Sequence, residues 1–305
     1  MNKIINLKHH EIDFLNLDTT TDTRLFIDPT KLYSNNLHPI FGKAHQKVAH
    51  FFRTAFKLYQ QNNQAKLKEL FSHSQECNYI HLGLSKGKSL GKGASQEMLL
   101  KFFELVAKAD DNSRKNLLTL TALSILSPKF AEDRTSDLLV SLLKKEIVEY
   151  TLEQARIHGI PISTKNYNFR EYWNSDSESW ENLESPYILG ADNQPLLLLP
   201  KVLITKRYHF QVIKFIRTII FVPYKEKLAG TFGYHKNGNA KPVPNRYLEK
   251  ELIKNQYIDS KSKYKQFAQD ELSKNPRQFD SFYTNITQFT NRSILSDDEL
   301  DELTK

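Results

Sequence analysis

The chain has 305 residues, of which 39% are hydrophobic and 26% charged, and its formal net charge is +8. This length suits one large domain or two ordinary ones, and the composition is that of a soluble globular protein. No segment approaches the roughly 18 consecutive apolar residues that span a membrane, which excludes a membrane location. The single cysteine excludes an internal disulfide. The charged N-terminus lacks the apolar core of a signal peptide, so we expect a cytoplasmic protein.

The first 130 residues predict short strands followed by helices. Residues 1–32 alternate apolar and polar side chains as two or three strands would, and Pro29 ends the last strand directly after Asp28. The apolar spacing then becomes helical, and Asn62 with Asn63 is expected to interrupt the first helix. The predicted elements of this part are helices over 45–71, 95–108 and 112–126 and a short strand over 77–84.

The most glycine-rich stretch lies over 83–93 and carries three lysines, Lys86, Lys88 and Lys92. It differs from a P-loop, because the pattern Gly-x-x-x-x-Gly-Lys-Ser/Thr has one more residue between its glycines than separates Gly83 from Gly87. Two interpretations remain. The stretch is either an anion-binding loop before a helix, whose free N–H groups attract anions, or a mobile surface loop.

Residues 131–159 predict the longest helix of the chain, over about 133–158. Asp133, Thr135 and Ser136 offer side-chain oxygens as caps at its start, and Gly159 is typical of the residue after a helix end. Between them, leucine and isoleucine recur at helical spacing and leave lysines and glutamates on the other side. We therefore expect a core helix with one solvent-exposed face, around which the other helices cluster.

The second half of the chain begins with an acidic stretch over 161–194, which predicts a junction with little regular structure. Residues 195–205 predict a buried strand, and Pro200 makes it either an edge strand or two short strands joined by a bend. The segment 208–222 suits a strand or a helix equally. The remaining predictions are a loop over 230–244, a polar helical region over 246–275 and a short, frayed acidic tail.

These elements predict an α+β fold, with a mixed sheet and a helical cluster built round the central helix, followed by a basic C-terminal α/β segment. The predicted organisation has four parts. They are N-terminal strands plus the helical cluster (1–160), the acidic irregular junction (161–194), the basic C-terminal segment (195–296) and the acidic tail (297–305).

The positive charge is concentrated late in the chain. Residues 1–200 hold 24 Lys/Arg against 23 Asp/Glu, whereas residues 201–296 hold 18 against 7. Cations bind phosphates and aromatic rings stack on bases, so their interleaving here suits nucleic acid, with DNA and RNA equally open. The alternative is an ordinary solvated surface with aromatics packed inside. The basic residues predicted to contact nucleic acid are Lys206, Arg207, Lys214, Arg217, Lys225 and Arg246, together with Lys86, Lys88 and Lys92.

Four residues form the candidate catalytic centre: Asp28, Asp133, Asp137 and Lys201. Phosphodiester hydrolysis commonly uses carboxylates that hold Mg²⁺, which prefers oxygen ligands, and a cation that stabilises the developing negative charge. The three aspartates are the predicted magnesium ligands. The alternative is that the acids at the start of the central helix only favour its dipole. The patterns HExxH and Gly-x-Ser-x-Gly are absent from the sequence, which argues against a helical zinc peptidase and an α/β-hydrolase.

The sequence therefore favours an intracellular nucleic-acid-binding protein with a magnesium-dependent nuclease centre. The alternative is a non-catalytic subunit that binds nucleic acid and other protein subunits within a nucleic-acid-processing complex. A nucleotide enzyme that uses the glycine–lysine loop ranks last, because the P-loop spacing is wrong.

Overall fold

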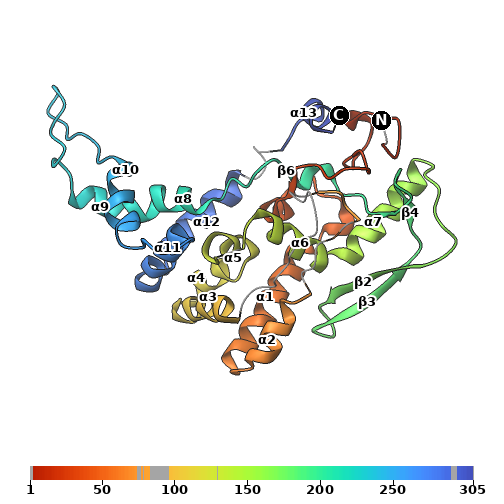
Figure 1. Ribbon diagram of the computed structural model, residues 1–305, viewed down its shortest axis with the longest axis horizontal. Coiled ribbons are helices and arrows are strands. Elements are labelled where there is room, and N and C mark those ends of the chain that lie inside the picture. Colours follow the sequence, from red (N-terminus) through yellow and green to blue (C-terminus); the bar gives the residue numbers. More distant parts are fainter. Residues whose placement is uncertain are drawn as a thin grey trace. The chain divides into compact units, whose positions relative to one another are not determined.

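The computed structural model describes residues 3–73, 77, 79–82, 96–128, 130–289 and 294–304 (Figure 1). The chain divides into two compact units, each assembled from segments that are distant in sequence. Unit 1 comprises residues 1–96, 131–208 and 287–305, and unit 2 comprises residues 97–130 and 209–286. Within the described ranges, no helix is both long enough and apolar enough to cross a membrane.

Small antiparallel ribbons in unit 1 and helices in both units make this an α+β fold, which confirms the predicted class. The ribbons pair β1 (Phe26–Ile27) with β6 (Ile204–Thr205), β2 (Tyr167–Asn174) with β3 (Ser179–Ser185), and β4 (Ile188–Leu189) with β5 (Pro195–Leu196). The helices of unit 1 are α1 (Ala44–Gln60), α2 (Gln64–Leu70), α6 (Glu132–Leu142), α7 (Lys144–Ile157) and α13 (Asp297–Leu303), with the 3₁₀ helices η1 (His9–Glu11), η2 (Pro29–Tyr33), η3 (Pro39–Phe41) and η4 (Lys201–Leu203).

The N-terminal segment forms less regular strand structure than its alternating pattern predicts. In the described part of this segment β1 is the one strand, and the other pairings are isolated bridges, such as that of Phe14 with Pro200. The predicted strand over 195–205 is broken at Pro200 into β5, η4 and β6, which is the bend that the sequence offered as one alternative. Proline cannot donate a hydrogen bond to a neighbouring strand, so pairing along this stretch stays short.

The predicted central helix is two helices, because the backbone turns at Leu143 (φ −103°, ψ 13°) between α6 and α7. The predicted caps at its start are wrong. The N-cap residue is Ala131, Thr135 donates its hydroxyl to the Ala131 carbonyl (2.8 Å), and the Ser136 hydroxyl accepts from the Ile27 N–H (3.0 Å). The predicted end is confirmed, since Gly159 has a φ of 66° just past the last turn.

The acidic stretch after the central helices is regular over Tyr167–Ser185, where β2 and β3 form a hairpin, so the prediction of an irregular segment is wrong there. Trp173 pairs directly with Trp180, and their ring centroids lie 5.7 Å apart. The alternation was hidden because the register shifts between Asn168 and Glu171, around Arg170 with its φ of 64°. A bulge of this kind moves the following side chains to the opposite face.

Local chemistry sets the breaks between the earlier helices. Asn62 has a φ of 54° and separates α1 from α2, as predicted. The predicted helix over 112–126 is two helices, α4 (Asp111–Leu117) and α5 (Leu120–Leu126). Asp110 accepts from the Ser113 N–H (2.9 Å) to cap α4, and Thr119 accepts from the Ala122 N–H (3.2 Å) to cap α5. Each cap satisfies an N–H group that the helix leaves unpaired.

Unit 2 is helical in its described residues. Beside α4 and α5 it contains α3 (Gln96–Lys108), α8 (Val212–Phe215), α9 (Phe221–Lys227), α10 (Asn245–Leu248), α11 (Lys263–Lys274), most of α12 (Gln278–Phe289), and the π-helical segments η5 (Ile216–Ile220) and η6 (Glu249–Lys254). The ambiguous stretch 208–222 is therefore largely helix. Phe215 packs against the rings of Phe279 (5.6 Å) and Phe282 (5.0 Å).

One lysine connects α11 to the end of α5. The Lys265 ammonium donates to three backbone carbonyls, those of Ser124 (2.6 Å), Ser127 (2.9 Å) and Phe130 (2.8 Å). The last carbonyls of a helix have no partner within it and carry its negative partial charge, so a cation there stabilises the helix end. Through this contact the segment 97–130 joins the segment 209–286 in one unit.

Candidate functional site

Three carboxylates of unit 1 lie around the phenol of Tyr208. Its hydroxyl donates to the carbonyls of Ile27 (2.9 Å) and Glu132 (3.1 Å). Burial raises the pKa of Tyr208 well above its ordinary value; a hydrogen bond with Ser136 lowers it, and the charges of Asp28, Glu132 and Asp137 raise it further. The phenol therefore stays neutral, and the two backbone carbonyls that it binds belong to the end of β1 and the first turn of α6.

Asp28 lies inside unit 1 with 1% of its surface exposed. It caps η2, since its Oδ1 accepts from the Thr30 N–H (2.9 Å) and hydroxyl (2.7 Å). Lys31 follows in the same turn and is fully buried, with its Nζ donating to the Ile204 carbonyl (2.5 Å). Burial lowers the pKa of Lys31 to about 8, and the Asp28 charge offsets part of that decrease. A buried cation thus accompanies the buried acid.

Asp133 and Asp137 lie four residues apart on α6, so they share a face of that helix, and both are half-buried. The part of the chain that the structure describes contains no group of three or more His, Cys, Asp or Glu side chains placed to hold a metal ion. Sites for Mg²⁺ in phosphoryl transfer commonly use one or two carboxylates and take the other ligands from water and substrate phosphates. A pair on one helix face has the donor atoms for such a site.

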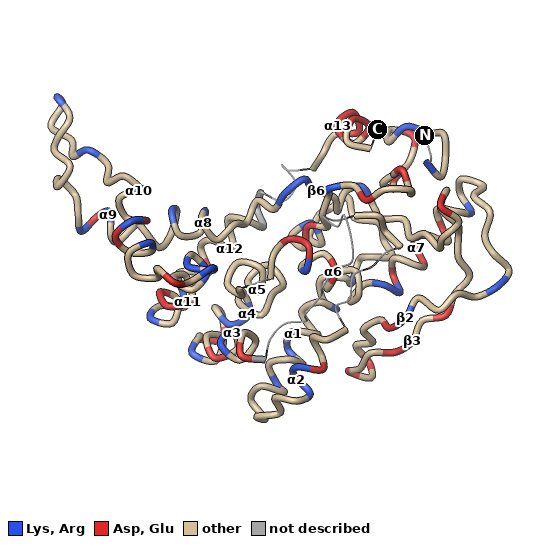
Figure 2. Tube along the Cα trace, viewed as in Figure 1, with Lys and Arg blue, Asp and Glu red and all other residues tan. Residues whose placement is uncertain are grey.

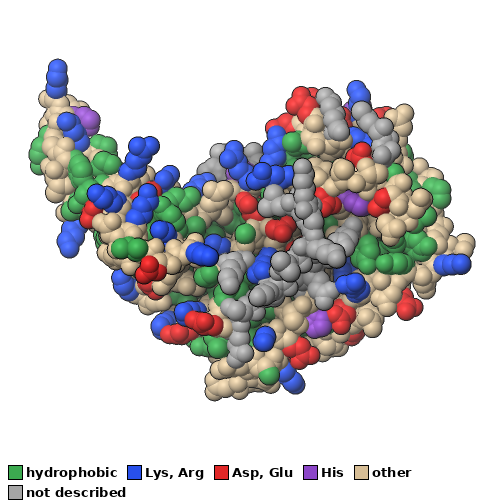
Figure 3. All heavy atoms as spheres, viewed as in Figure 1, with side chains coloured by type: hydrophobic (Ala, Val, Ile, Leu, Met, Phe, Trp, Pro, Cys, Tyr) green, Lys and Arg blue, Asp and Glu red, His purple; other side chains and the backbone are tan. Residues whose placement is uncertain are grey.

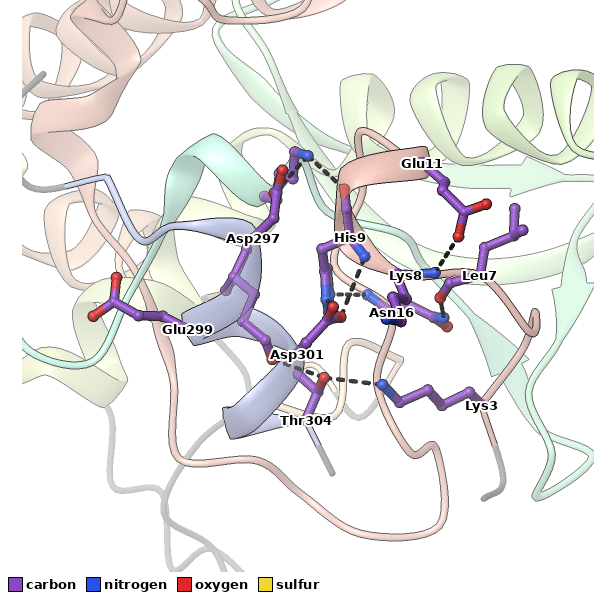
Figure 4. Close-up of polar contacts among 12 residues, drawn as sticks. Lys3, Leu7, Lys8, His9, Glu11, Asn16, Asp297, Glu299, Asp301 and Thr304 are labelled. Carbon is purple, nitrogen blue, oxygen red and sulfur yellow. Dashed lines mark hydrogen bonds and ion pairs between the residues drawn. The ribbon is translucent and has the colours of Figure 1, made fainter.

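Lys201 is bound to the acidic helix α13 rather than to these aspartates. Its Nζ donates to the His9 carbonyl (2.6 Å) and to Asp297 Oδ1 (2.7 Å) (Figure 4). Lys206 lies 3.8 Å from Glu299 of the same helix. Two of the predicted functional cations therefore face carboxylates of α13.

The predicted frayed tail is instead a capped and docked helix. Ser296 and Glu299 form a reciprocal capping box at the start of α13. Figure 4 shows Asp301 directed at His9, whose Nδ1 lies 2.6 Å from Asp301 Oδ1. The His9 Nε2 accepts from the Asn16 N–H (3.1 Å), so Nδ1 carries the proton and donates it to Asp301. The prediction failed because these partners lie at the opposite end of the sequence.

The docking of α13 is expected to weaken as the pH falls below about 6.5. Burial lowers the pKa of His9 below its ordinary 6.5, although the hydrogen bond with Asp301 offsets part of this decrease. At a pH between the lowered pKa of docked His9 and the ordinary 6.5, the undocked state binds more protons than the docked state. The contribution of His9 to the docking of α13 is therefore fully present above about pH 6.5 and decreases as the pH falls toward the lowered pKa. Backbone amides of α13 should exchange with deuterium faster at about pH 5.5 than at pH 7.5, after correction for intrinsic rates.

A matched pair of substitutions tests which histidine is responsible. His10 is exposed next to the buried His9, so His10→Gln should keep the pH dependence of exchange. His9→Gln cannot titrate and should lose it. Protection of α13 that is equal at both pH values in the unmodified protein would contradict this role of His9.

The net positive charge belongs to unit 2. That unit holds 19 Lys/Arg against 11 Asp/Glu, whereas unit 1 holds 24 of each. The charge is densest over residues 212–254, which we call the basic arm; it runs from α8 to η6 and has nine Lys/Arg against three Asp/Glu. Figure 2 shows these cations along α8 and α9 and at the tip of the loop before α10.

Most cations of the basic arm are exposed, and Figure 3 shows Lys and Arg side chains over the visible face of α8, α9 and the following loop. The exposed set that makes no ion pair with a described carboxylate is Lys214, Lys227, Lys236, Lys241, Arg246, Lys250 and Lys254. Lys225 is half-exposed and donates to the Arg217 carbonyl (3.4 Å). Three predicted nucleic-acid contacts, Lys214, Lys225 and Arg246, thus belong to one continuous segment.

Arg217 has a structural partner. Its Nε and Nη2 lie 2.8 and 2.7 Å from Glu249 Oε1, and Glu249 is only 5% exposed. The pair joins the π-helical segments η5 and η6. Of the remaining predicted contacts, Arg207 lies in unit 1 with an exposed side chain, and Lys86, Lys88 and Lys92 lie outside the described residues.

Residues 4–211 match a family described as Domain of unknown function (DUF8370). The chain belongs to this family. Neither the curated proteins nor the solved structures contain a match to the chain. The DUF8370 region holds the acids around Tyr208 and ends directly before α8, so the basic arm and α13 both lie beyond it.

Sequence reasoning missed two residues of this site within the DUF8370 region. Lys31 follows Asp28 by three residues. Pro29 between them is typical of the first residue of a helical turn, and such a turn would have predicted that the two side chains lie close together. No local signal indicated Tyr208, because it contacts Ile27 across 181 residues of sequence. The placement of that ring depends on the pairing of β1 with β6.

Proposed function

We propose that the protein binds nucleic acid through the basic arm. The observation that carries this proposal is the segregation of charge, since unit 2 accounts for the whole formal net charge of the chain. Lys and Arg that neutralise phosphates release counterions, which supplies most of the non-specific affinity for nucleic acid. A concentrated field of one sign also accelerates association with a polyanion.

The arm differs from an ordinary solvated surface, on which both signs are interspersed. Of its three acids, Glu249 is buried against Arg217, which leaves Glu226 and Glu251 to balance the exposed cations. Exposed rings accompany the cations: Tyr234 is 64% and Tyr247 40% exposed. Cations beside accessible aromatic rings are typical of surfaces that bind phosphates and bases.

The test is the affinity for labelled single-stranded and duplex oligonucleotides, measured by fluorescence anisotropy. Between about 50 and 200 mM salt we expect affinity to fall at least about 100-fold, as for several phosphate contacts. A triple variant, Lys214→Glu, Lys227→Glu and Arg246→Glu, should bind at least about 100-fold more weakly at low salt.

The matched control changes three exposed lysines of unit 1 that make no ion pair with a described carboxylate: Lys66→Glu, Lys68→Glu and Lys165→Glu. Both triple variants change the net charge equally, so only the position of the charge differs. A much smaller loss of affinity in the control supports the basic arm. Equal losses in the two variants, or no binding by the unmodified protein, would refute it.

A second proposal concerns Asp28, Asp133 and Asp137: that they form a magnesium-dependent centre for phosphodiester hydrolysis. What supports it is the pair Asp133 and Asp137, which lie four residues apart on one face of α6. The aspartates of α6 would hold Mg²⁺, and the ion would supply an activated water and neutralise charge on the phosphate. The rival is the non-catalytic subunit, in which these acids only stabilise the start of α6.

Cleavage of plasmid and single-stranded substrates with and without Mg²⁺ separates the two. Asp137→Asn should reduce magnesium-dependent cleavage at least about 100-fold without changing oligonucleotide affinity. Asp176→Asn, an exposed acid in the β2–β3 turn, is the control and should cleave normally. Binding without any cleavage by the unmodified protein would favour the non-catalytic subunit.

A further inference from the structure

The loop between α9 and α10 contains a small hairpin, residues 233–241, which we call the finger. Tyr234 bridges Ala240, the His235 N–H donates to the Asn239 carbonyl (2.8 Å), and the Lys241 N–H donates to the Gly233 carbonyl (2.8 Å). The finger is thus a short two-stranded hairpin within the loop that the sequence predicted over 230–244.

Turn chemistry closes the tip of the finger. The Gly238 N–H donates to the His235 carbonyl (3.0 Å), and Gly238 itself has a φ of 82°. A turn followed by a residue in the left-handed region is a common three-residue hairpin connection, and glycine occupies that position without strain. The tip, His235-Lys236-Asn237-Gly238-Asn239, is exposed at every residue.

The base of the finger is anchored within unit 2. Phe232 packs edge-on against Tyr247 at 5.1 Å, and Val243 is 5% exposed. A Cβ on Gly230 would lie 2.6 Å from the Tyr234 hydroxyl, so the tyrosine lies directly against this glycine backbone. The base of the finger therefore packs within unit 2, while its tip stays exposed.

The charge of the finger is of one sign. No Asp or Glu occurs between Glu226 and Glu249, while Lys236 and Lys241 are exposed and make no ion pair with a described carboxylate. The tip adds two asparagines and a histidine, whose amide and imidazole groups can hydrogen-bond to base edges. The finger therefore carries side chains that can bind phosphates and side chains that can bind bases.

We propose that the finger enters the major groove of duplex DNA, with Lys236 and Lys241 on the phosphates and Asn237 and Asn239 on the base edges. This inference rests on the proposed nucleic-acid binding by the basic arm. The major groove of B-form DNA admits a two-stranded ribbon, whereas the major groove of duplex RNA is too narrow and deep for side chains to read. The shape of the finger therefore selects DNA over RNA and duplex over single strand.

The experiment uses the full chain with the double substitution Lys236→Ala and Asn239→Ala. It keeps Gly238 and Asn237, whose Oδ1 accepts from the Asn239 N–H within the turn (3.2 Å). The matched control removes the same residue types at exposed sites of unit 2 outside the basic arm: Lys261→Ala and Asn255→Ala. We expect the finger variant to bind duplex DNA at least about 10-fold more weakly and to lose clearly less affinity for single strands. Methylation of guanine N7, which lies in the major groove, should be blocked by the unmodified protein and by the control but not by the finger variant.

The outcomes separate this inference from the proposal beneath it. Duplex binding by the unmodified protein without guanine protection, or an equal affinity of the finger variant and the control, would overturn the finger and leave the basic arm intact. An equal loss of single-strand and duplex affinity would make the finger a general phosphate contact and overturn groove entry. Absence of binding to every oligonucleotide would remove the basic arm and the finger together.

Discussion

Replacing Trp173 by alanine is expected to lower the free energy of unfolding of unit 1 by about 3–5 kcal/mol. The indole is fully buried and lies edge-on to Phe51 of α1 (5.2 Å) and to Trp180 of β3 (5.7 Å). Removing it leaves a cavity between the β2–β3 hairpin and α1 that the remaining rings cannot fill. The lost packing and the cavity both contribute to the effect.

Chemical unfolding followed by circular dichroism measures the effect, because tryptophan fluorescence changes with the substitution itself. Trp173→Phe is the control. The Trp173 indole N–H makes no hydrogen bond with the described residues, so phenylalanine removes part of the ring without breaking a polar contact. Its cost should be clearly smaller than that of alanine. A loss below about 1 kcal/mol for the alanine variant would mean that the hairpin does not pack on α1.

Arg217→Ala is expected to destabilise unit 2 by about 1–3 kcal/mol, because it leaves a buried carboxylate without its half-exposed cation. Glu249 is 5% exposed, and its other contact is the Tyr264 hydroxyl at 3.4 Å from Oε2. Without Arg217, the Glu249 carboxylate is still removed from water, and no ion pair offsets the free-energy cost of that desolvation. The double variant Arg217→Ala with Glu249→Gln removes that charge and should recover much of the stability.

Unfolding in urea compares the single and double variants, and oligonucleotide affinity is measured on the same samples. Arg217 was predicted to contact nucleic acid, but its ion pair gives it a structural role that the double variant isolates. Restored stability together with unchanged affinity would assign Arg217 to the scaffold. A double variant no more stable than Arg217→Ala would contradict the role of the pair.

The sequence predicted features that depend on local chemistry. The break at Asn62, the helix end at Gly159 and the bend at Pro200 each follow from the conformational preference of one residue, and all three occur in the structure. The β2–β3 hairpin was missed because the bulge at Arg170 interrupts alternation and the acids on its exposed side resemble a loop.

The candidate site was predictable only in part, for the same reason. Asp28 was predicted at a strand end and Asp137 near a helix start, and they lie directly after β1 and within α6. Their grouping as magnesium ligands stays a prediction. The partners of Lys201 and Arg217 were not predictable, because Asp297 and Glu249 lie far away in sequence and no spacing rule connects them. Composition did locate the positive charge, since a net charge requires no knowledge of contacts.

The contact between the two extremes of the chain has a consequence for synthesis. Lys3 donates to Thr304, and His9 donates to Asp301, so an early segment binds a segment that is translated much later (Figure 1). The segment around Lys3 and His9 stays without these partners while nearly three hundred intervening residues are translated. Unit 2 is encoded wholly within that interval and has all its own segments before α13 exists. Completion of unit 1 therefore cannot precede the synthesis of α13, and a translation product that stops before α13 would lack these contacts.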